Sequence, residues 1–235
     1  MTLPRPEELA CTPVELAGHT LQVWHIRDLD AFLARLLDEH PVFPDDDIPY
    51  YAWIWPSARV LAEALLAGPP LDGVSAVELG CGTGMVGVAA AVRGAQVTLT
   101  DLQEGALELA RRNAQACGTG ARVTVARLDW RQPHLAPVPL LLCSDVLYEA
   151  RLAEPLAACV AALLAPGGTA LLADPSRPHF GRFVDAAARQ GLEVETGPVR
   201  PTPEGADVRL YAVRRPGEVH TPRWAWDTGR VERGC

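Results

Sequence analysis

The stretch Val77-Glu-Leu-Gly-Cys-Gly-Thr-Gly-Met-Val-Gly87 is an apolar run that ends in an acid and continues into alternating glycines. It predicts a strand, a tight turn and then a helix, because glycine adopts positive φ angles at little steric cost. Free N–H groups at the start of that helix favour a polar ligand above the turn. A second apolar run, Val97–Thr100, ends at Asp101, whose carboxylate is placed to accept hydrogen bonds from a ribose diol. The stretch therefore predicts a nucleotide-type cofactor site.

Two cofactors are compatible with this spacing, and a purely structural glycine-rich turn is the plain alternative. Gly82, Gly84 and Gly87 match the dinucleotide fingerprint, with Asp101 near the expected offset, so NAD is one candidate. The acid-x-Gly-x-Gly-x-Gly arrangement that starts at Glu78 resembles motif I of the class I methyltransferases. An acid before the loop attracts a ligand with ammonium and sulfonium groups and repels a pyrophosphate. S-adenosylmethionine is therefore the predicted cofactor.

Composition narrows the class of protein. The chain has 235 residues, of which 49% are hydrophobic and 21% charged, and this balance predicts one sizeable globular domain. No apolar run is long enough to span a bilayer and no basic-then-apolar segment opens the chain, so we expect a cytoplasmic protein without a membrane partner. The net charge of −8 and the lack of a basic cluster disfavour nucleic acid. The six cysteines lack metal-site spacing, and all 21 basic residues are arginine.

The order of strand-like and helix-like segments predicts an α/β fold. Apolar β runs alternate with amphipathic helices across residues 45–215, which indicates a Rossmann-like, doubly wound, seven-stranded and mostly parallel sheet. The short link between the last two runs, 192–196 and 208–213, predicts a C-terminal antiparallel hairpin. Residues 1–44 are predicted as an N-terminal extension made of a hairpin and a helix, and residues 216–235 as a tail.

An aromatic segment, Pro49-Tyr-Tyr-Ala-Trp-Ile-Trp-Pro56, precedes the predicted domain's first helix. Aromatic side chains fill cores and also cover ligands, so two interpretations stay open at this point. The segment either plugs the core or forms a lid over the adenine or the methyl group.

Acidic residues recur at the predicted strand ends, at Glu78, Asp101, Asp129, Asp145 and Asp174. One such acid is explained by a helix cap or a loop contact. Ligands of parallel α/β sheets bind outside the carboxyl ends of the strands, so the series predicts a polar site along one edge of the sheet.

Asp145-Val-Leu-Tyr148 follows the fourth predicted strand and places a carboxylate and a phenol three residues apart. A methyl acceptor must present a lone pair in line with the sulfonium carbon, and a carboxylate that binds an amine would aim that lone pair. The same carboxylate raises the pKa of the amine and so opposes the unprotonated form that reacts. Aromatic walls and the positive cofactor act in the opposite direction, and the sequence leaves the balance open.

These motifs together resemble a known family. Trp53-Ile-Trp-Pro56, the stretch 77–84, the acids Asp101 and Asp129 and the Asp145-x-x-Tyr148 tetrapeptide are similar, in that order, to the seven-β-strand protein-lysine methyltransferases of the family-16 group. The resemblance implies an S-adenosylmethionine-dependent N-methyltransferase whose partner is a protein substrate bearing a lysine, with Asp145 and Tyr148 orienting the acceptor amine. It implies cofactor contacts from Trp55, Glu78, Gly80, Cys81, Gly82, Gly84, Asp101, Leu102, Asp129, Trp130 and Ser144.

The aromatic segment and Asp174-Pro-Ser-Arg177 resemble more specifically the bacterial relatives of the electron transfer flavoprotein β-subunit lysine methyltransferase, some of which are also described as nicotinamide N-methylases. Serine at position 176, where that subgroup is expected to have glycine, leaves the substrate open. A small amine or pyridine is the alternative acceptor, and an NAD-binding reductase is a more distant alternative.

Overall fold

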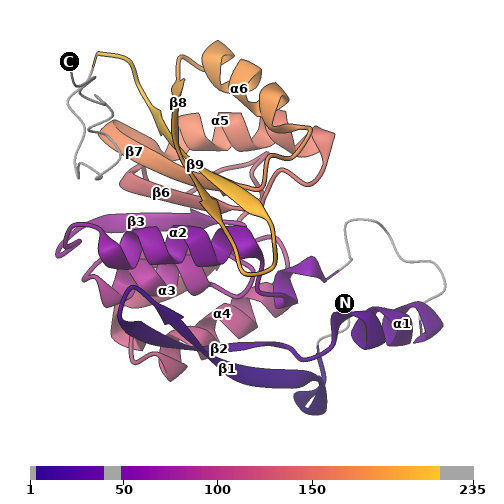
Figure 1. The fold of residues 1–235 in the computed structure, drawn as a ribbon. Helices are drawn as coiled ribbons and strands as arrows, with labels where there is room; N and C mark the ends of the chain where they lie inside the picture. Colours follow the sequence, from indigo (N-terminus) through magenta and orange to yellow (C-terminus); the bar gives the residue numbers. More distant parts are fainter. Residues whose placement is uncertain (1–3, 40–48, 218–235) are drawn as a thin grey trace, which may run out of the picture.

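The computed structural model describes residues 4–39 and 49–217. A seven-stranded sheet forms its centre, with strand order β5-β4-β3-β6-β7-β9-β8 (Figure 1). Its strands are β3 (Ser75–Leu79), β4 (Gln96–Asp101), β5 (Val123–Arg127), β6 (Val138–Ser144), β7 (Leu164–Asp174), β8 (Glu193–Pro201) and β9 (Asp207–Arg214). The helices around it are α2 (Pro56–Ala67), α3 (Met85–Val92), α4 (Glu104–Ala116), α5 (Ala153–Leu163) and α6 (Phe180–Arg189).

The strand order places a topological switch point between β3 and β6. Strands β3, β4 and β5 follow one another toward one edge, whereas β6 and β7 extend from β3 toward the other, and all five are parallel. Open α/β sheets bind ligands at the carboxyl ends of the strands that flank such a point. The loop after β3 and the loop after β6 therefore define where a site is expected.

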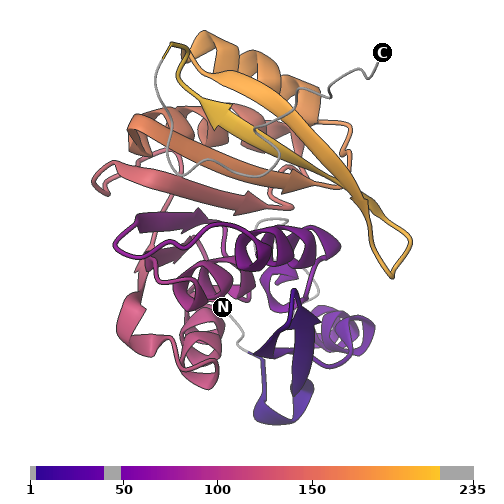
Figure 2. The same ribbon diagram turned by 60° about the vertical axis from the view of Figure 1, so that its left-hand side comes forward.

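Helices cover both faces of the sheet because strand residues alternate between two apolar clusters. Ala76 of β3 and Leu142 of β6 belong to the cluster that contains α2, α3 and part of α4. Val77 and Cys143 belong to the opposite cluster, with α5 and α6. The sheet separates these two groups of helices (Figure 2). This doubly wound arrangement confirms the predicted fold class.

The C-terminal part differs from the prediction in one respect. Strand β7 begins at Leu164, five residues before Thr169, where the sequence predicts the fifth strand to start, because Leu164 already pairs with Val138 of β6. Pro166-Gly167-Gly168 lies in a register shift before regular pairing resumes at Thr169. The glycines thus accommodate a bulge inside a longer strand instead of a loop. The predicted final hairpin is present, since β8 and β9 pair antiparallel and β9 joins β7.

The N-terminal segment forms the hairpin β1 (Leu9–Leu16) and β2 (His19–Ile26), followed by α1 (Leu29–Glu39). Side chains from both strands join the apolar cluster of α2 and α3, so the hairpin is packed against the rest of the molecule. The acidic residues 45–47 and the tryptophans 224 and 226 lie outside the described residues. Among the described residues, no helix has the length and apolar character needed to cross a membrane.

Candidate active site

The loop after β3 has the backbone conformation that its glycines predict. Gly80, Gly82 and Gly84 have φ angles of +66°, +51° and +73°. A Cβ atom at Gly84 would lie 2.8 Å from the Cβ of Ala110 in α4, so only glycine fits there without displacing a neighbour. The N–H of Cys81 donates to the carbonyl of Thr100 at 2.8 Å and fixes the loop against β4.

Glu78 has a structural contact that the sequence did not predict. Its Oε2 accepts a hydrogen bond from the N–H of Gly87, in the first turn of α3, at 2.8 Å. The carboxyl group is buried, and burial raises its pKa to about 8, with the hydrogen bond from Gly87 acting in the opposite direction and Asp101 adding to the rise. In its ionised form this carboxylate would complement the dipole at the helix N-terminus. Direct contact between Glu78 and a cofactor stays a prediction.

Asp101 lies at the carboxyl end of β4 and faces the same loop. Its Oδ2 accepts from the N–H of Gly82 at 3.1 Å and its Oδ1 from the N–H of Gln103 at 3.0 Å. Burial raises the pKa of this carboxyl, against the hydrogen bonds that favour its charged form. Each carboxylate oxygen accepts about two hydrogen bonds, so both retain capacity for ligand hydroxyls. Leu102, the next residue, is 39% exposed and offers apolar surface beside them.

Trp130 lies over the glycine loop, whereas Asp129 is engaged elsewhere. A Cβ atom at Gly80 would approach the Trp130 ring to 3.1 Å and Val146 to 3.0 Å, so the ring and the loop are in close contact. Asp129 pairs with Arg131 at 2.8 Å, and hydrogen bonding to Arg131 lowers the pKa of Asp129. The predicted contact of Asp129 with the adenine amino group stays a prediction, and it requires a remaining lone pair, because both carboxylate oxygens already accept hydrogen bonds from Arg131.

The aromatic segment divides between the two interpretations. Tyr51 is buried in the core, and its carbonyl oxygen lies 3.0 Å from where a Cβ of Gly82 would be, so its backbone covers the loop. Burial raises the pKa of the Tyr51 phenol. Tyr50 is exposed, and its ring lies 6.2 Å from that of Trp55 and 6.0 Å from that of Tyr148. The segment is therefore both core and surface, with Tyr50 on the side of the predicted acceptor residues.

Asp145 follows β6 and is almost fully buried, with 7% of its surface exposed. Its φ angle is +58°, an unusual conformation for a non-glycine residue that clusters at functional sites. The Oδ1 atom accepts hydrogen bonds from Nε and Nη2 of Arg177 at 2.7 and 2.5 Å. Tyr148 is 44% exposed. Arg177 was not among the predicted site residues, although its tetrapeptide was noted for the family resemblance.

Asp174 and Ser176 hold the segment that carries Arg177. Oδ1 of Asp174 accepts from the N–H of Arg177 at 2.7 Å, whereas the buried Oδ2 has no hydrogen-bond partner among the described residues. Burial raises the pKa of Asp174, and the charge of Asp145 adds to that rise. Ser176, at the expected glycine position, has a φ angle of +63°. A strained backbone and an unsatisfied buried oxygen thus occur beside the Asp145–Arg177 ion pair.

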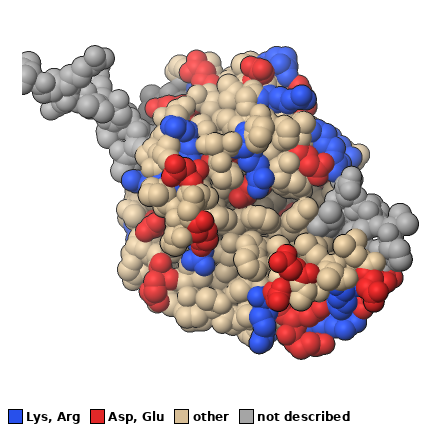
Figure 3. Space-filling view, turned by 45° about the vertical axis from the view of Figure 1, so that its right-hand side comes forward, with Lys and Arg blue, Asp and Glu red and all other residues tan. Residues whose placement is uncertain are grey.

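The sheet brings most predicted site residues to one edge of the molecule. Figure 3 shows a hollow near the centre of one face, with both acidic and basic side chains at its border. Ser144 ends β6 immediately before Asp145 and pairs in register with Ala173 of β7. The carboxyl ends of β3, β4, β6 and β7 therefore converge here, as the strand-end acids predicted.

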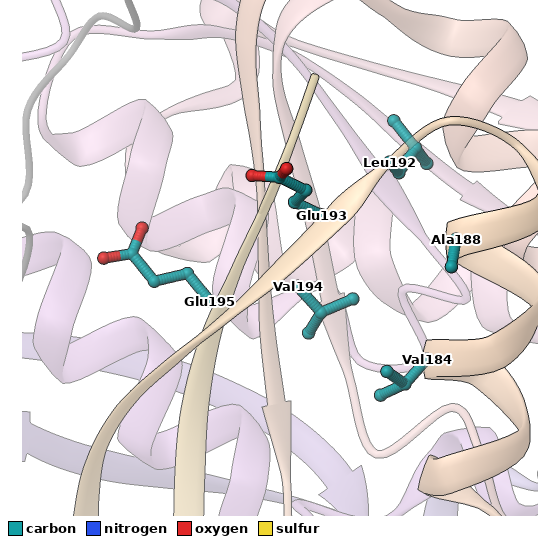
Figure 4. Close-up of a pocket in the computed structure, with 6 residues that line it drawn as sticks. All are labelled: Val184, Ala188, Leu192, Glu193, Val194 and Glu195. Carbon is teal, nitrogen blue, oxygen red and sulfur yellow. The ribbon is translucent and has the colours of Figure 1, made fainter. Parts of the chain in front are cut away.

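Two pockets in the described part of the chain lie at the opposite end of the strands from the glycine loop. None of the predicted site residues lines either pocket. One lies between α6 and β8, where Val184, Ala188 and Val194 face one another while Glu193 and Glu195 point away (Figure 4). The other is lined by the amino-terminal ends of β3, β4 and β6. The strand register places both far along the sheet from the glycine loop.

The fold of this protein is similar to that of a methyltransferase of known structure. Magnesium protoporphyrin IX methyltransferase from Synechocystis PCC 6803, solved with bound SAM, superposes with a TM-score of 0.56 at 18% identity, covering 80% of this chain and 97% of that one. At that identity the likeness shows the fold alone, which is the Rossmann-like methyltransferase fold.

The sequence profile described as lysine methyltransferase matches residues 50–184, and the chain belongs to that family. Protein N-lysine methyltransferase METTL21A of Mus musculus is 42% identical over 105 residues, which cover 41% of this chain and 48% of that protein. EEF1A lysine methyltransferase 3 of Mus musculus is 37% identical over 135 residues, which cover 55% of this chain and 58% of that protein. The matches thus span about half the length of these curated relatives.

Proposed function

We propose that this protein is an S-adenosylmethionine-dependent N-methyltransferase that acts on a lysine side chain of a protein. One observation carries the proposal: the glycine loop after β3 and the buried Asp145 after β6 flank the same topological switch point. A cofactor on the loop and an amine at Asp145 would then be neighbours. Membership of the lysine methyltransferase family supports the choice of reaction and acceptor.

The residues around the glycine loop fit the proposed cofactor. Asp101 has lone pairs left for the ribose diol, and Leu102 offers apolar surface for the adenine. Ionised Asp101 gives the site negative potential, and the ammonium and sulfonium charges of a bound cofactor would in turn favour ionisation of the buried Glu78. Trp130 closes the loop from the side of β6. When bound, the cofactor would supply an electrophilic methyl group attached to positive sulfur.

The acceptor side fits a lysine better than a compact amine. Tyr50 and Tyr148 are exposed and their rings contact each other, so they offer an accessible apolar surface for the methylene chain of a lysine. Asp145 lies deeper, where a hydrogen bond would aim the nitrogen lone pair. The aromatic segment and Asp174-Pro-Ser-Arg177 resemble the flavoprotein β-subunit enzymes, but Ser176 departs from their pattern, so the identity of the protein substrate stays open.

The test incubates the full chain with methyl-labelled S-adenosylmethionine and a lysate of its source organism, followed by separation of the label by molecular size. We expect label in a discrete protein band. Asp145→Asn should lose transfer and retain cofactor binding, measured by calorimetry. Asp207→Asn, a change of an exposed aspartate at the start of β9, is the matched control and should transfer normally.

Other outcomes select other functions. Label confined to the small-molecule fraction would identify an amine or pyridine methyltransferase. Saturable NAD binding without S-adenosylmethionine binding would instead favour the reductase alternative. Equal loss of cofactor binding and of transfer in Asp145→Asn would remove Asp145 from the acceptor side.

A further inference from the structure

The ion pair of Asp145 and Arg177 bears on the chemistry of the acceptor, given the function proposed above. Nε and Nη2 of Arg177 both bind Oδ1 of Asp145, and no hydrogen bond to Oδ2 occurs among the described residues. Asp145 is 4% exposed at its side chain and Arg177 is 28% exposed. One carboxylate oxygen is thus committed to a cation while the other is left for an incoming group.

A lone carboxylate would work against methyl transfer. In the transfer step the lone pair of the amine forms the new N–C bond while the electrons of the C–S bond pass to sulfur. An ammonium has no such lone pair, so a proton must first leave the nitrogen for water. A nearby unpaired carboxylate favours the ammonium and raises its pKa by about one to three units. A carboxylate whose charge is already balanced by a guanidinium raises the pKa of the amine much less. Its free oxygen still accepts an N–H hydrogen bond from the amine.

We propose that Arg177 is a positioning residue that neutralises Asp145, so that this carboxylate orients the acceptor amine without holding it in its protonated form. The inference rests on the proposed N-methyltransferase function and assigns Arg177 to it. Arg177 acts through Asp145 and makes no contact with the reacting atoms. Arg177 thereby weakens the rise that Asp145 would cause in the pKa of the acceptor amine, which is the balance that the sequence left open.

Hydrogen bonds to neighbouring groups fix the backbone of Arg177. Its N–H donates to Asp174, and its carbonyl accepts from the N–H of Phe180 at the start of α6 at 3.1 Å. Among the described residues, the titratable and charged groups near the pair include Asp174 itself, Tyr148 on the Asp145 loop, and Arg209 and Tyr211 on β9, which pairs with β7.

The test compares Arg177→Gln, Arg177→Lys and Arg182→Gln with the unchanged protein. Arg182 is an exposed arginine in α6, so its variant controls for the loss of one positive charge. The acceptor used in these measurements is the purified protein identified from the labelled band of the assay above. Its dissociation constant is measured in the presence of S-adenosylhomocysteine, which permits binding but no transfer, and kcat is measured from pH 6 to 10.

We expect a split between binding and turnover. Arg177→Gln frees the charge of Asp145, so the acceptor should bind several-fold more tightly at pH 7. At the same pH kcat should fall about tenfold or more, and it should recover at a pH about one to two units higher than in the unchanged protein. Arg177→Lys and Arg182→Gln should keep the original pH profile.

Weaker acceptor binding together with an equal loss of kcat at every pH would assign Arg177 a merely structural role and overturn the inference. If Arg177→Gln does not fold, a pH profile of Arg177→Lys displaced by more than one unit would overturn it equally. Failure of the proposed function looks different, because the unchanged protein would then label no protein band at all.

Discussion

Asn113 binds Trp24 across 89 residues of sequence, through two hydrogen bonds between its side-chain amide and the Trp24 backbone, at 2.6 and 3.0 Å. The same Nδ2 also donates to the carbonyl of Thr83 in the glycine loop at 2.8 Å. Arg112 covers the Trp24 ring, with its Cζ 3.4 Å from the ring centroid. The N-terminal hairpin is thus fastened to the loop that we assign to the cofactor.

Asn113→Ala should therefore destabilise the protein and the loop together. The change removes the Asn113 hydrogen bonds to the half-buried N–H and carbonyl of Trp24 and to the buried carbonyl of Thr83, which costs about 2–4 kcal/mol in the free energy of unfolding. Cofactor affinity should fall as well, because the Thr83 segment loses its anchor. Denaturant unfolding and calorimetry measure the two effects. Gln115→Ala, on the exposed face of the same helix, should change neither, and a similar loss in that variant would contradict the explanation.

Gly84→Ala tests whether the loop needs glycine for space or only for its backbone conformation. Gly84 and Gly118 have similar φ angles, +73° and +69°, but a Cβ at Gly118 would meet nothing within 4 Å. Gly118→Ala should cost about 1–2 kcal/mol of stability from the backbone alone. Gly84→Ala should cost about 1–3 kcal/mol more because its methyl group would overlap Ala110. Equal costs by denaturant unfolding would show that the close approach has no energetic effect.

Glu78→Gln should alter how stability depends on pH. The raised pKa, about 8 against 4.5 in an unfolded chain, means that the folded protein holds a proton that the unfolded chain releases. This stabilisation is present below pH 4.5 and is lost as the pH rises toward 8. Relative to the variant, the unchanged protein should lose about 3 kcal/mol between pH 5 and 8.

Unfolding in urea at pH 5, 6.5 and 8 measures that difference. Glu63→Gln, a change of an exposed residue in α2, is the control. Its free energy of unfolding should depend on pH in the same way as that of the unchanged protein. A difference between Glu78→Gln and the unchanged protein that stays constant with pH would mean that Glu78 is ionised throughout.

Ser176→Gly should relieve strain beside the candidate site. Serine at a φ angle of +63° costs about 1–2 kcal/mol that glycine avoids, partly offset by about 0.5–1 kcal/mol from the greater freedom of unfolded glycine. We expect a gain of roughly 0.5–1 kcal/mol by differential scanning calorimetry. Ala17→Gly, at a φ of +47° in the β1–β2 turn, should give a similar gain far from the site. A loss of stability in Ser176→Gly alone would indicate that the serine side chain has a role of its own.

The sequence predicted the features that local patterns encode. The alternating apolar residues of β3 and β6, the glycine loop and the acids at strand ends were sufficient for the fold class and for the edge of the sheet at which these acids lie. The bulge at Pro166-Gly-Gly was missed because a break in periodicity looks the same in a loop and in an irregular strand.

Long-range polar contacts were the part that could not be predicted. Arg177 reaches Asp145 across 32 residues, and nothing in the spacing of either motif indicates that the two side chains meet. Asn113 resembles any polar residue on an amphipathic helix until β2 is placed against it. Glu78 was assigned to the ligand by its position, although its Oε2 faces the N–H of Gly87. Such pairings depend on how elements pack, which single-chain patterns do not encode.

The chemical identity of the modified residue tests the central claim most directly. The labelled protein band is hydrolysed in acid and its amino acids are separated. We predict that the label elutes with methylated lysine and that Asp145→Asn abolishes it. Label in methylated arginine, or its release during hydrolysis as methylamine from a methylated glutamine or as methanol from a methyl ester, would contradict the assignment of a lysine acceptor at Asp145.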